Sequence, residues 1–339
     1  MTGRSPVPPP PSRPHRSGTT VTGVTSDVVV YRVPLTTRFR GLTARDGVLL
    51  RGPAGWAEFS PFWDYDDAAA RPWWRAAREA ADLGWPTAVR MAVPVNVTVP
   101  AVGPDEARAM VLASGCRTAK VKVAEPGQAP AEDVARLEAV RDALGPGGRI
   151  RVDANAAWDV DTAVARIRAL DRAAGGLEYV EQPCRTVGDL AAVRRAVDVP
   201  IAADEAVRLA ADPMAVVRAE AADVVVLKVA PLGGVRACLE LAERVGLPVV
   251  VSSALETSVG LAAGLALAAA LPDLPYACGL ATARLLAADV VADPLLPVDG
   301  MLAVRRPEPD PALLVAHAAD DALVARWKTR LAAVSEVTG

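Results

Sequence analysis

Histidine is almost absent from this sequence, since only His15 and His317 occur in 339 residues. Nucleophilic triads, histidine-rich zinc centres and the HExxH helix all need a histidine beside other fixed polar groups. His15 lies in a proline-rich segment and His317 lies near the other end of the chain. These classes of enzyme are therefore strongly disfavoured.

Aromatic residues and an excess of positive charge are also lacking. Aromatic residues make up 4% of the chain, and its formal net charge is −3. Nucleic-acid-binding proteins usually carry a basic surface, and those that bind single strands add aromatic stacking platforms. We therefore expect no nucleic-acid partner.

Long apolar runs and paired cysteines are missing as well. The longest apolar run extends from Val259 to Leu271, which is shorter than the ~20 residues that a bilayer-spanning helix needs. No early stretch has the apolar core of a secretory signal. The four cysteines form no CxxC pair and lie far apart, at Cys116, Cys184, Cys238 and Cys278. We expect reduced thiols in a cytoplasmic protein without a membrane partner.

Lysine is scarce for its charge class. Only four of the 37 basic residues are lysines, namely Lys120, Lys122, Lys228 and Lys328. Arginine keeps its proton at any workable pH, whereas a buried lysine can release it. In a protein that uses arginine for ordinary positive charge, buried lysines are candidates for proton transfer. The alternative is that these lysines have no special role.

Composition divides the chain into four parts. The start is rich in proline, serine, threonine and glycine, and such a composition cannot offset the entropy of an ordered backbone. Strand-like runs at 28–31, 47–50 and 56–59, a helical stretch at 71–83 and clustered tryptophans then indicate a small α+β domain, with the tryptophans as core packing. The predicted parts are a disordered tail (1–25), the N-terminal part of this first domain (26–93), a region of alternating strands and helices (94–290) and a C-terminal segment that packs back on the first domain with a short strand and a helix (291–339).

From about Pro94 a repeated alternation begins. Short runs rich in valine, isoleucine and alanine alternate with amphipathic stretches such as 106–114, 132–144 and 160–173. This alternation predicts parallel strands with crossover helices, either in an open sheet or in a closed barrel. Eight units favour the barrel, and no GxGxxG follows the first strand, which weakens a dinucleotide-binding alternative. The predicted strands are 94–98, 118–122, 150–153, 177–181, 201–204, 224–228, 248–252 and, as an eighth, 276–279.

Polar residues stand at the carboxyl ends of successive predicted strands, at intervals of 23 to 31 residues. Equivalent positions of a parallel barrel lie around one rim, where such barrels perform chemistry. The alternative is that strands simply end in polar residues as they reach solvent, but this does not predict three consecutive acids flanked by lysines. The residues are Lys122, Asp153, Glu181, Asp204, Lys228 and Ser252.

Three carboxylates at one place repel one another, and a divalent cation removes that conflict. Oxygen ligands without histidine or cysteine favour Mg²⁺, with Mn²⁺ as a substitute, over zinc. We therefore expect Asp153, Glu181 and Asp204 to be metal ligands. Asn155 and Glu205 adjoin them and are expected to orient the ligands.

Lys120 and Lys122 are two residues apart on a predicted strand, so both side chains point to one face. Two adjacent ammonium groups disfavour double protonation, which is expected to lower one pKa toward that of a general base. Lys228 comes from the far side of the carboxylates. A metal with a lysine on each flank suits removal of a proton α to a carboxylate and stabilisation of the resulting enediolate.

The order of these motifs resembles the enolase superfamily, in its muconate-lactonizing subgroup. The motifs are Lys120-Val-Lys122, Asp153-Ala-Asn155, Glu181-Gln-Pro183, Asp204-Glu205 and Lys228. The stretches 55–62, 94–100, 227–234 and 252–260 are similar to the o-succinylbenzoate synthase family in its actinobacterial form. The resemblance covers roughly residues 27–305.

The resemblance implies a TIM-like (β/α)₇β barrel, with an α+β capping domain built from the N-terminal part and the C-terminal segment. The implied reaction is the Mg²⁺-dependent syn dehydration of 2-succinyl-6-hydroxy-2,4-cyclohexadiene-1-carboxylate to 2-succinylbenzoate, a step of menaquinone biosynthesis. By the same resemblance, Lys122 removes the proton and then protonates the departing hydroxyl, Lys228 stabilises the enediolate, and Lys120 tunes Lys122.

The resemblance also implies substrate-binding residues, which are Arg40, Ser258 and Gly260. Residues 258–260 would hold the succinyl tail through backbone N–H groups, and the loop 38–41 would close over the site. A solvated basic turn is the alternative for that loop.

Two competing functions remain open. An N-succinylamino acid racemase or a dipeptide epimerase would use the same metal ligands and opposed lysines on the same scaffold. A non-catalytic anion-binding barrel, or a scaffold protein, would keep the charged rim without a tuned base. In each reading except the scaffold the partner is a small-molecule carboxylate, and the sequence carries no signal of oligomeric state.

Overall fold

The structure is a computed structural model that describes residues 28–335. The predicted disordered tail, residues 1–25, lies outside the described residues. Within the described range, no helix is long and apolar enough to cross a membrane. The four cysteines are buried and unpaired with one another.

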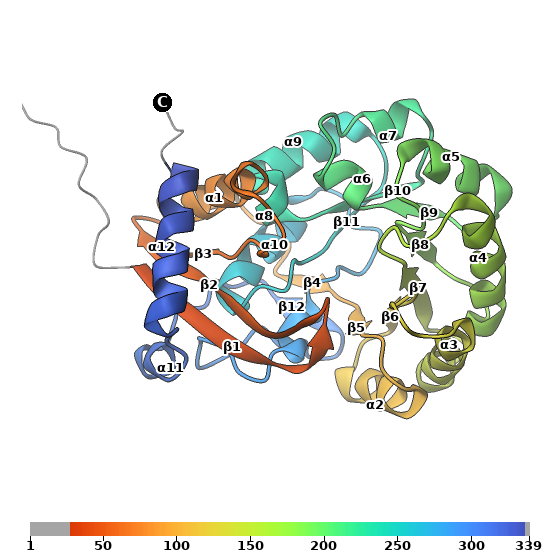
Figure 1. Ribbon diagram of the computed structural model, residues 1–339, viewed down its shortest axis with the longest axis horizontal. Helices are drawn as coiled ribbons and strands as arrows, with labels where there is room; N and C mark the ends of the chain where they lie inside the picture. Colours follow the sequence, from red (N-terminus) through yellow and green to blue (C-terminus); the bar gives the residue numbers. More distant parts are fainter. Residues whose placement is uncertain (1–27, 336–339) are drawn as a thin grey trace, which may run out of the picture.

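The first domain is an antiparallel three-stranded sheet followed by a helix (Figure 1). Its elements are β1 (Val28–Phe39), β2 (Leu42–Gly52), β3 (Gly55–Phe59) and α1 (Asp67–Asp82). The helix starts four residues earlier than the predicted 71–83, because the Asp66 side chain accepts a hydrogen bond from the Ala69 backbone N–H at 2.8 Å and so caps it. These elements, together with the C-terminal helix described in the next paragraph, are called the cap.

The C-terminal segment contributes the last layer of the cap. It holds two helices rather than the predicted one, α11 (Pro311–Ala316) and α12 (Asp321–Ser335). Helix α12 contacts α1 and β1, and Trp327 is fully buried against the Phe59 ring, with centroids 5.8 Å apart. The predicted short strand is β12 (Met301–Ala303), and it pairs with β4 (Ala92–Pro94) at the barrel instead of with the cap. The tryptophan cluster is core packing, as expected.

The barrel is built from parallel strands that neighbour one another in chain order, with helices on the outside (Figure 1). The strands are β5 (Val97–Val99), β6 (Thr118–Lys122), β7 (Arg149–Asp153), β8 (Tyr179–Glu181), β9 (Ile201–Ala203), β10 (Val224–Leu227) and β11 (Val249–Val251). The helices are α2 (Pro104–Ser114), α3 (Pro130–Leu144), α4 (Val160–Ala174), α5 (Val187–Ala196), α6 (Glu205–Arg208), α7 (Ala215–Arg218), α8 (Val229–Leu232), α9 (Val235–Val245) and α10 (Ser258–Ala270), with a 3₁₀ turn at Ala281–Leu285.

The predicted eighth strand, 276–279, is present only as two single-residue bridges. Cys278 bridges to Val95 and Gly279 bridges to Ser252, both in parallel orientation. The Gly279 backbone N–H donates to the Val251 carbonyl at 2.8 Å. These bridges join β11 to the start of the sheet, so the closed barrel is confirmed and the open sheet is not.

Alternation of side chains along β6 separates the core from the site. Val121 faces outward into the apolar layer between strands and helices, together with Leu137 and Val140 of α3. Lys120 and Lys122 face the barrel interior, as the period of two along a strand requires. Below them the interior is filled by Tyr179, by alanine and valine side chains and by the buried Arg151.

Candidate active site

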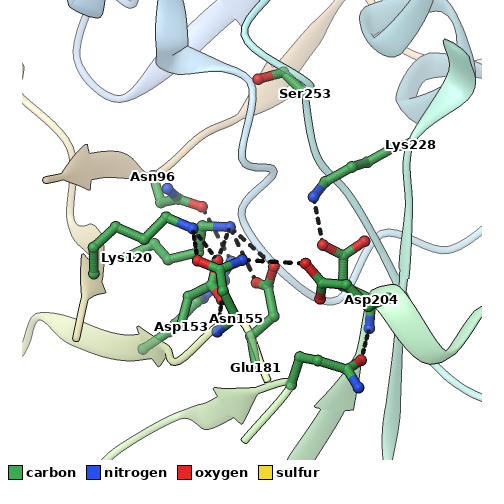
Figure 2. A network of polar contacts seen from close by, with 12 residues as sticks. Asn96, Lys120, Asp153, Asn155, Glu181, Asp204, Lys228 and Ser253 are labelled. Atoms are coloured by element: carbon green, nitrogen blue, oxygen red, sulfur yellow. Dashed lines mark hydrogen bonds and ion pairs between the residues drawn. The ribbon is translucent and has the colours of Figure 1, made fainter. Parts of the chain in front are cut away.

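Three acidic side chains flanked by lysines stand side by side at one rim of the barrel (Figure 2). Register pairs Lys122 with Asp153 and Asp153 with Glu181, on β6, β7 and β8. Asp204 and Lys228 directly follow β9 and β10, the next two strands of the sheet. The structure therefore brings these five predicted residues to one place.

The lysines of β6 bind the carboxylates beside them. The Lys120 ammonium donates to Asp153 Oδ2 at 3.2 Å and to both Glu181 oxygens at 3.1 Å. The Lys122 ammonium donates to Asp153 Oδ2 at 2.5 Å and to Asn155 Oδ1 at 2.6 Å. Lys120 is almost fully buried, whereas 17% of the Lys122 side chain is exposed. Lys122 is thus the more accessible lysine of this pair.

Asp204 is held from three directions. The Lys228 ammonium donates to its Oδ2 at 2.5 Å, and the Arg208 guanidinium donates to its Oδ1 at 2.9 Å. The buried Gln182 side chain accepts hydrogen bonds from the backbone N–H groups of Asp204, at 2.9 Å, and Ala206, at 3.1 Å. These contacts fix both the carboxylate and the backbone at the end of β9.

The three carboxyl groups do not share their charge equally. Burial and the neighbouring Asp153 charge raise the pKa of Glu181 to about 7, against the opposing effect of Lys120. Burial also acts against ionisation of Asp153, yet the Lys122 and Lys120 charges hold its pKa well below the usual range. Burial is likewise outweighed at Asp204, where Lys228 and Arg208 lower the pKa to about 2. Of the three carboxyl groups, Glu181 therefore gives up its proton least readily.

The expected lowering of a lysine pKa does not occur at Lys120. Burial alone lowers its pKa, but the charges of Glu181 and Asp153 outweigh burial and raise the pKa above its ordinary value. The sequence argument considered two ammonium groups side by side. In the structure the Lys120 ammonium instead lies between two carboxylates, which favour its charged form.

Asn155 and Glu205 adjoin the carboxylates, as expected. The Asn155 side-chain amide donates to Glu205 Oε1 at 3.2 Å, and its backbone N–H donates to Asp153 Oδ1 at 3.1 Å. Asn155, Ala156 and Gln182 all have positive φ, at 45°, 62° and 41°. Such strained backbone persists only where the surroundings hold it, and here it lies at the ends of β7 and β8.

The chemistry of the donor set fits a hard divalent cation, because every candidate ligand atom is a carboxylate oxygen. Glu205 Oε2 is buried and, among residues 28–335, has no hydrogen-bond partner. Over the same range, no three acidic, histidine or cysteine side chains surround a common point. The Lys120 ammonium lies between Asp153 and Glu181, and Lys122 and Lys228 bind Asp153 and Asp204, so a cation would have to compete with these ion pairs.

A cleft of about 1370 Å³ opens above the charged rim, and Lys122, Lys228 and Asn155 are among its lining residues. The hairpin tip between β1 and β2, residues 38–41, forms part of its wall. The Phe39 ring lies 5.6 Å from the Lys122 ammonium. Arg40 lines the cleft, but its guanidinium pairs with Asp64 at 3.0 Å and lies over the Phe62 ring at 4.4 Å.

Ser258 and Gly260 are not brought to this cleft. The Ser258 backbone N–H donates to Asp289 Oδ2 at 3.1 Å, and the Gly260 backbone N–H donates to Glu58 Oε2 at 3.2 Å. Carboxylates inside the protein therefore already accept the hydrogen bonds of these amides. The polar residues Ser253 and Thr282 line the cleft instead.

Sequence reasoning missed Gln182 and Arg208. Gln182 was quoted only as part of the Glu-Gln-Pro motif, although its position between two acidic strand ends was a usable signal. Arg208 follows Asp204 by four residues, the spacing of a helical ion pair. Its guanidinium also donates to Glu205 Oε1 at 2.8 Å and to the hydroxyl of Tyr65, just before α1, so it connects the rim with the cap.

Two protein-family models match the chain. The model described as Enolase N-terminal domain-like matches residues 30–81, and the model described as Enolase C-terminal domain-like matches residues 104–310. The first match covers the cap sheet and most of α1. The second covers the barrel from α2 onward, with the three carboxylates and the lysines.

Two curated relatives of this chain share the same name. The chain is 67% identical over 303 residues to a protein of Thermobifida fusca named o-succinylbenzoate synthase, a match that covers 89% of this chain and 94% of the relative. It is 53% identical over 305 residues to the protein of the same name from Mycobacterium tuberculosis, with 90% of this chain and 92% of the relative covered.

Solved structures show the same fold. The L-Ala-D/L-Glu epimerase from Bacillus subtilis superposes with a TM-score of 0.71 at 24% identity, covering 84% of this chain and 96% of that one. A muconate lactonizing enzyme from Pseudomonas fluorescens superposes with a TM-score of 0.74 at 23% identity, covering 86% and 98%. At this identity the likeness concerns the fold alone.

Proposed function

The chain belongs to the o-succinylbenzoate synthase family of the enolase superfamily, and from that premise we propose that it is a hydro-lyase. The substrate is 2-succinyl-6-hydroxy-2,4-cyclohexadiene-1-carboxylate, and the products are 2-succinylbenzoate and water. The reaction depends on Mg²⁺ and belongs to menaquinone biosynthesis. The observation that carries the proposal is the row of three buried carboxylates with Lys122 at one end and Lys228 at the other, beneath one cleft.

Lys122 has the position that the proton transfers need. As the free amine it takes the proton from the ring carbon that bears the carboxylate, and the electron pair of that C–H bond forms the new ring double bond. The neighbouring C–O bond breaks, and the Lys122 ammonium returns the proton to the departing hydroxyl, which leaves as water. One base on one face thus suffices for a syn elimination.

The other charged residues hold the metal ion or stabilise the negative charge that develops on the substrate. Lys228, from the opposite end of the row, places a cation against the developing negative charge on the substrate carboxylate. Lys120 lies between Asp153 and Glu181 and sets the charge around Lys122. Asp153, Glu181 and Asp204 would hold Mg²⁺, which supplies electrostatic stabilisation of a carboxylate-derived anion when bound.

Racemisation or epimerisation is the second candidate, and a specific observation favours it. Lys122 and Lys228 both reach the cleft from opposite ends of the carboxylate row, and a two-base reaction needs a proton donor on each face. Solved structures with this fold include an enzyme titled N-succinyl Arg/Lys racemase from Bacillus cereus. Dehydration uses one lysine as base, so kinetics distinguish the two.

The test supplies each substrate to the purified protein in separate assays with MgCl₂. We expect formation of the aromatic product, followed by ultraviolet absorbance, with a higher kcat/KM than racemisation of an N-succinyl amino acid, followed by polarimetry. Treatment with EDTA should abolish dehydration, and Mg²⁺ should restore it. Much faster racemisation, or no dehydration in the presence of Mg²⁺, would contradict the proposal.

A further inference from the structure

One wall of the cleft has no regular secondary structure. Residues 252–255, which follow β11, line the cleft and are called the cleft wall. In Figure 2 Ser253 lies above Asp153 and Glu181, apart from the network of dashed contacts. Leu255 has a φ of 64°, a left-handed conformation that is unfavourable for a non-glycine residue. A conformation of this kind persists only when other contacts impose it.

The cap imposes it through Arg45 of β2. The Arg45 guanidinium donates from Nε to the Leu255 carbonyl at 3.0 Å, and it donates also to the carbonyl of Ser60. The Phe62 ring lies 4.3 Å from the guanidinium carbon. Arg45 is 2% exposed, and the Leu255 side chain is buried in the apolar core of the cap. The cleft wall is therefore anchored in the cap at its Leu255 end, whereas the backbone N–H groups of Ser252 and Ser253 donate to carbonyls of the barrel.

Glu58 of β3 fixes the end of the same segment. Its Oε2 accepts hydrogen bonds from the backbone N–H groups of Thr257, at 3.1 Å, and Gly260, at 3.2 Å, and from the Thr257 hydroxyl. Its Oε1 accepts from the hydroxyls of Tyr31 and Ser60, both at 2.7 Å. Donors that surround a carboxylate on both oxygens favour its ionised form, although burial raises the pKa of Glu58.

Glu256 completes the attachment from inside the segment. Its Oε2 accepts a hydrogen bond from the backbone N–H of Ala254, a residue of the cleft wall, at 2.8 Å. A small void of about 20 Å³ lies beside Glu58 and Glu256, which is the space that one water molecule needs. The cap and the cleft wall thus meet through buried polar groups with little free volume.

We infer that Arg45 and Glu58 are positioning residues that set the shape of the cleft wall and thereby the affinity for substrate, without taking part in proton transfer. This inference rests on the proposed function for the identity of the substrate only. The lysines support the separation of roles, because Lys122 and Lys228 form their hydrogen bonds with Asp153, Asn155 and Asp204. A displaced cleft wall changes what binds, while the groups that move the proton stay in place.

The test compares three variants. Glu58→Ala leaves two backbone N–H groups without their acceptor. Glu58→Gln keeps an oxygen toward Thr257, and its NH₂ can face Tyr31 and Ser60, whose hydroxyls can turn to accept. Tyr31→Phe is the matched control, because it removes a hydrogen bond from the same carboxylate on the side away from the cleft wall.

We expect Glu58→Ala to raise KM for the cyclohexadiene substrate about 10-fold or more, with kcat within about 3-fold of wild type. Glu58→Gln and Tyr31→Phe should stay within about 2-fold in KM. Backbone amide hydrogen exchange of peptides covering 252–257 should rise in Glu58→Ala and return to the wild-type rate in Glu58→Gln. If Glu58→Ala does not fold, Thr257→Val removes one of the same hydrogen bonds at constant volume, and the same direction of change is expected.

An unchanged KM in Glu58→Ala, or a fall in kcat at constant KM, would overturn the inference while leaving the proposed function standing. Unchanged amide exchange at 252–257 would overturn it as well. If the wild-type protein does not dehydrate the substrate, the proposed function fails, and the exchange measurement still decides whether Glu58 holds the cleft wall.

Discussion

The charged rim of the barrel and the junction between cap and cleft wall both bury carboxylates, and they treat them differently. At the rim each carboxylate contacts a lysine ammonium group from another part of the barrel, as Asp153 contacts Lys122. At the junction Glu58 is surrounded by neutral donors from Tyr31, Ser60, Thr257 and Gly260. Neutral hydrogen bonds fix a position, whereas ion pairs can exchange charge and protons with a ligand.

One carboxyl group in each region has a raised pKa, and the two groups differ in the positive charge that lies near them. Burial and a second carboxylate raise the pKa of Glu181 at the rim and of Glu256 at the junction, both to about 7. Glu181 has the Lys120 ammonium in contact, at 3.1 Å. Glu256 has the more distant Arg45 as its favourable charge. Variants that alter chemistry should therefore map to the rim, and variants that alter position or stability should map to the junction.

Lys122→Ala should have the largest effect and would show that the rim performs the chemistry. Loss of a general acid–base group typically costs about 10²–10⁴-fold in rate, and we expect kcat for dehydration to fall toward the upper end of that range. Calorimetric titration should show that Mg²⁺ binding is retained. Lys328→Ala is the matched control, since Lys328 is an exposed lysine of α12. Unchanged activity in Lys122→Ala would favour the non-catalytic barrel.

Glu256→Gln should change the pH dependence of stability. The pKa of Glu256 is about 7 in the folded protein and about 4.3 in an unfolded chain. Folding therefore binds a proton between these values, and the wild type loses stability as pH rises from about 4.5 to 7, then stays level. The groups that face Glu256 are Glu58 of β3 and Arg45 of β2.

Because Glu256→Gln cannot titrate, its unfolding free energy relative to wild type should rise by about 3 kcal/mol between pH 4.5 and 8. Urea denaturation at several pH values measures this difference. Glu243→Gln on the exposed face of α9 is the matched control. A difference that is independent of pH would show that the junction does not hold a protonated carboxyl group.

Asp204→Asn should weaken Mg²⁺ binding by at least about tenfold, because a neutral amide replaces a charged oxygen ligand. Calorimetric titration of the protein with MgCl₂ measures the change directly, without substrate. Asp212→Asn is the control, since Asp212 is an exposed aspartate paired with Arg218 a few residues along the chain. Equal affinities for Mg²⁺ in Asp204→Asn and wild type would remove Asp204 from the ligand set.

Arg40→Ala should have the smallest effect. Its side chain is 40% exposed and pairs with the exposed Asp64, and exposed ion pairs contribute only ~0–1 kcal/mol. We expect KM to rise about 2–3-fold through loss of contacts at the cleft, with kcat and thermal stability unchanged. Asp64→Asn separates the ion pair from the cleft contact. A large fall in kcat for Arg40→Ala would show that the hairpin tip takes part in catalysis.

The charged rim could be predicted because each strand-plus-helix repeat of a parallel barrel places the next strand end beside the previous one. Residues one repeat apart in the sequence therefore lie side by side at the rim. Lys122, Asp153 and Glu181 are register partners, so their spacing along the chain sufficed to place them together. Strand β6 begins and ends where its alternating run predicted, at Thr118 and Lys122. The eighth strand was predicted at 276–279, and the structure has single-residue bridges there, at Cys278 and Gly279; the sequence run did not show that pairing would be limited to these two residues.

The remaining features depend on contacts between distant segments. The family resemblance implied that backbone N–H groups at residues 258–260 hold the succinyl tail, but carboxylates 31 and 202 residues away accept the hydrogen bonds of the Ser258 and Gly260 amides. The raised pKa of Lys120 required knowledge of both carboxylates that it bridges. Local pattern therefore determines which residues reach the rim, and long-range packing determines the charge that they carry.

The cap takes its strands from one end of the chain and α12 from the other, with Trp327 buried against Phe59. A ribosome that synthesises this chain releases β1 to β3 first and α12 last. The nascent cap sheet therefore exposes part of its apolar face while the barrel is synthesised, which favours aggregation until α12 packs against it.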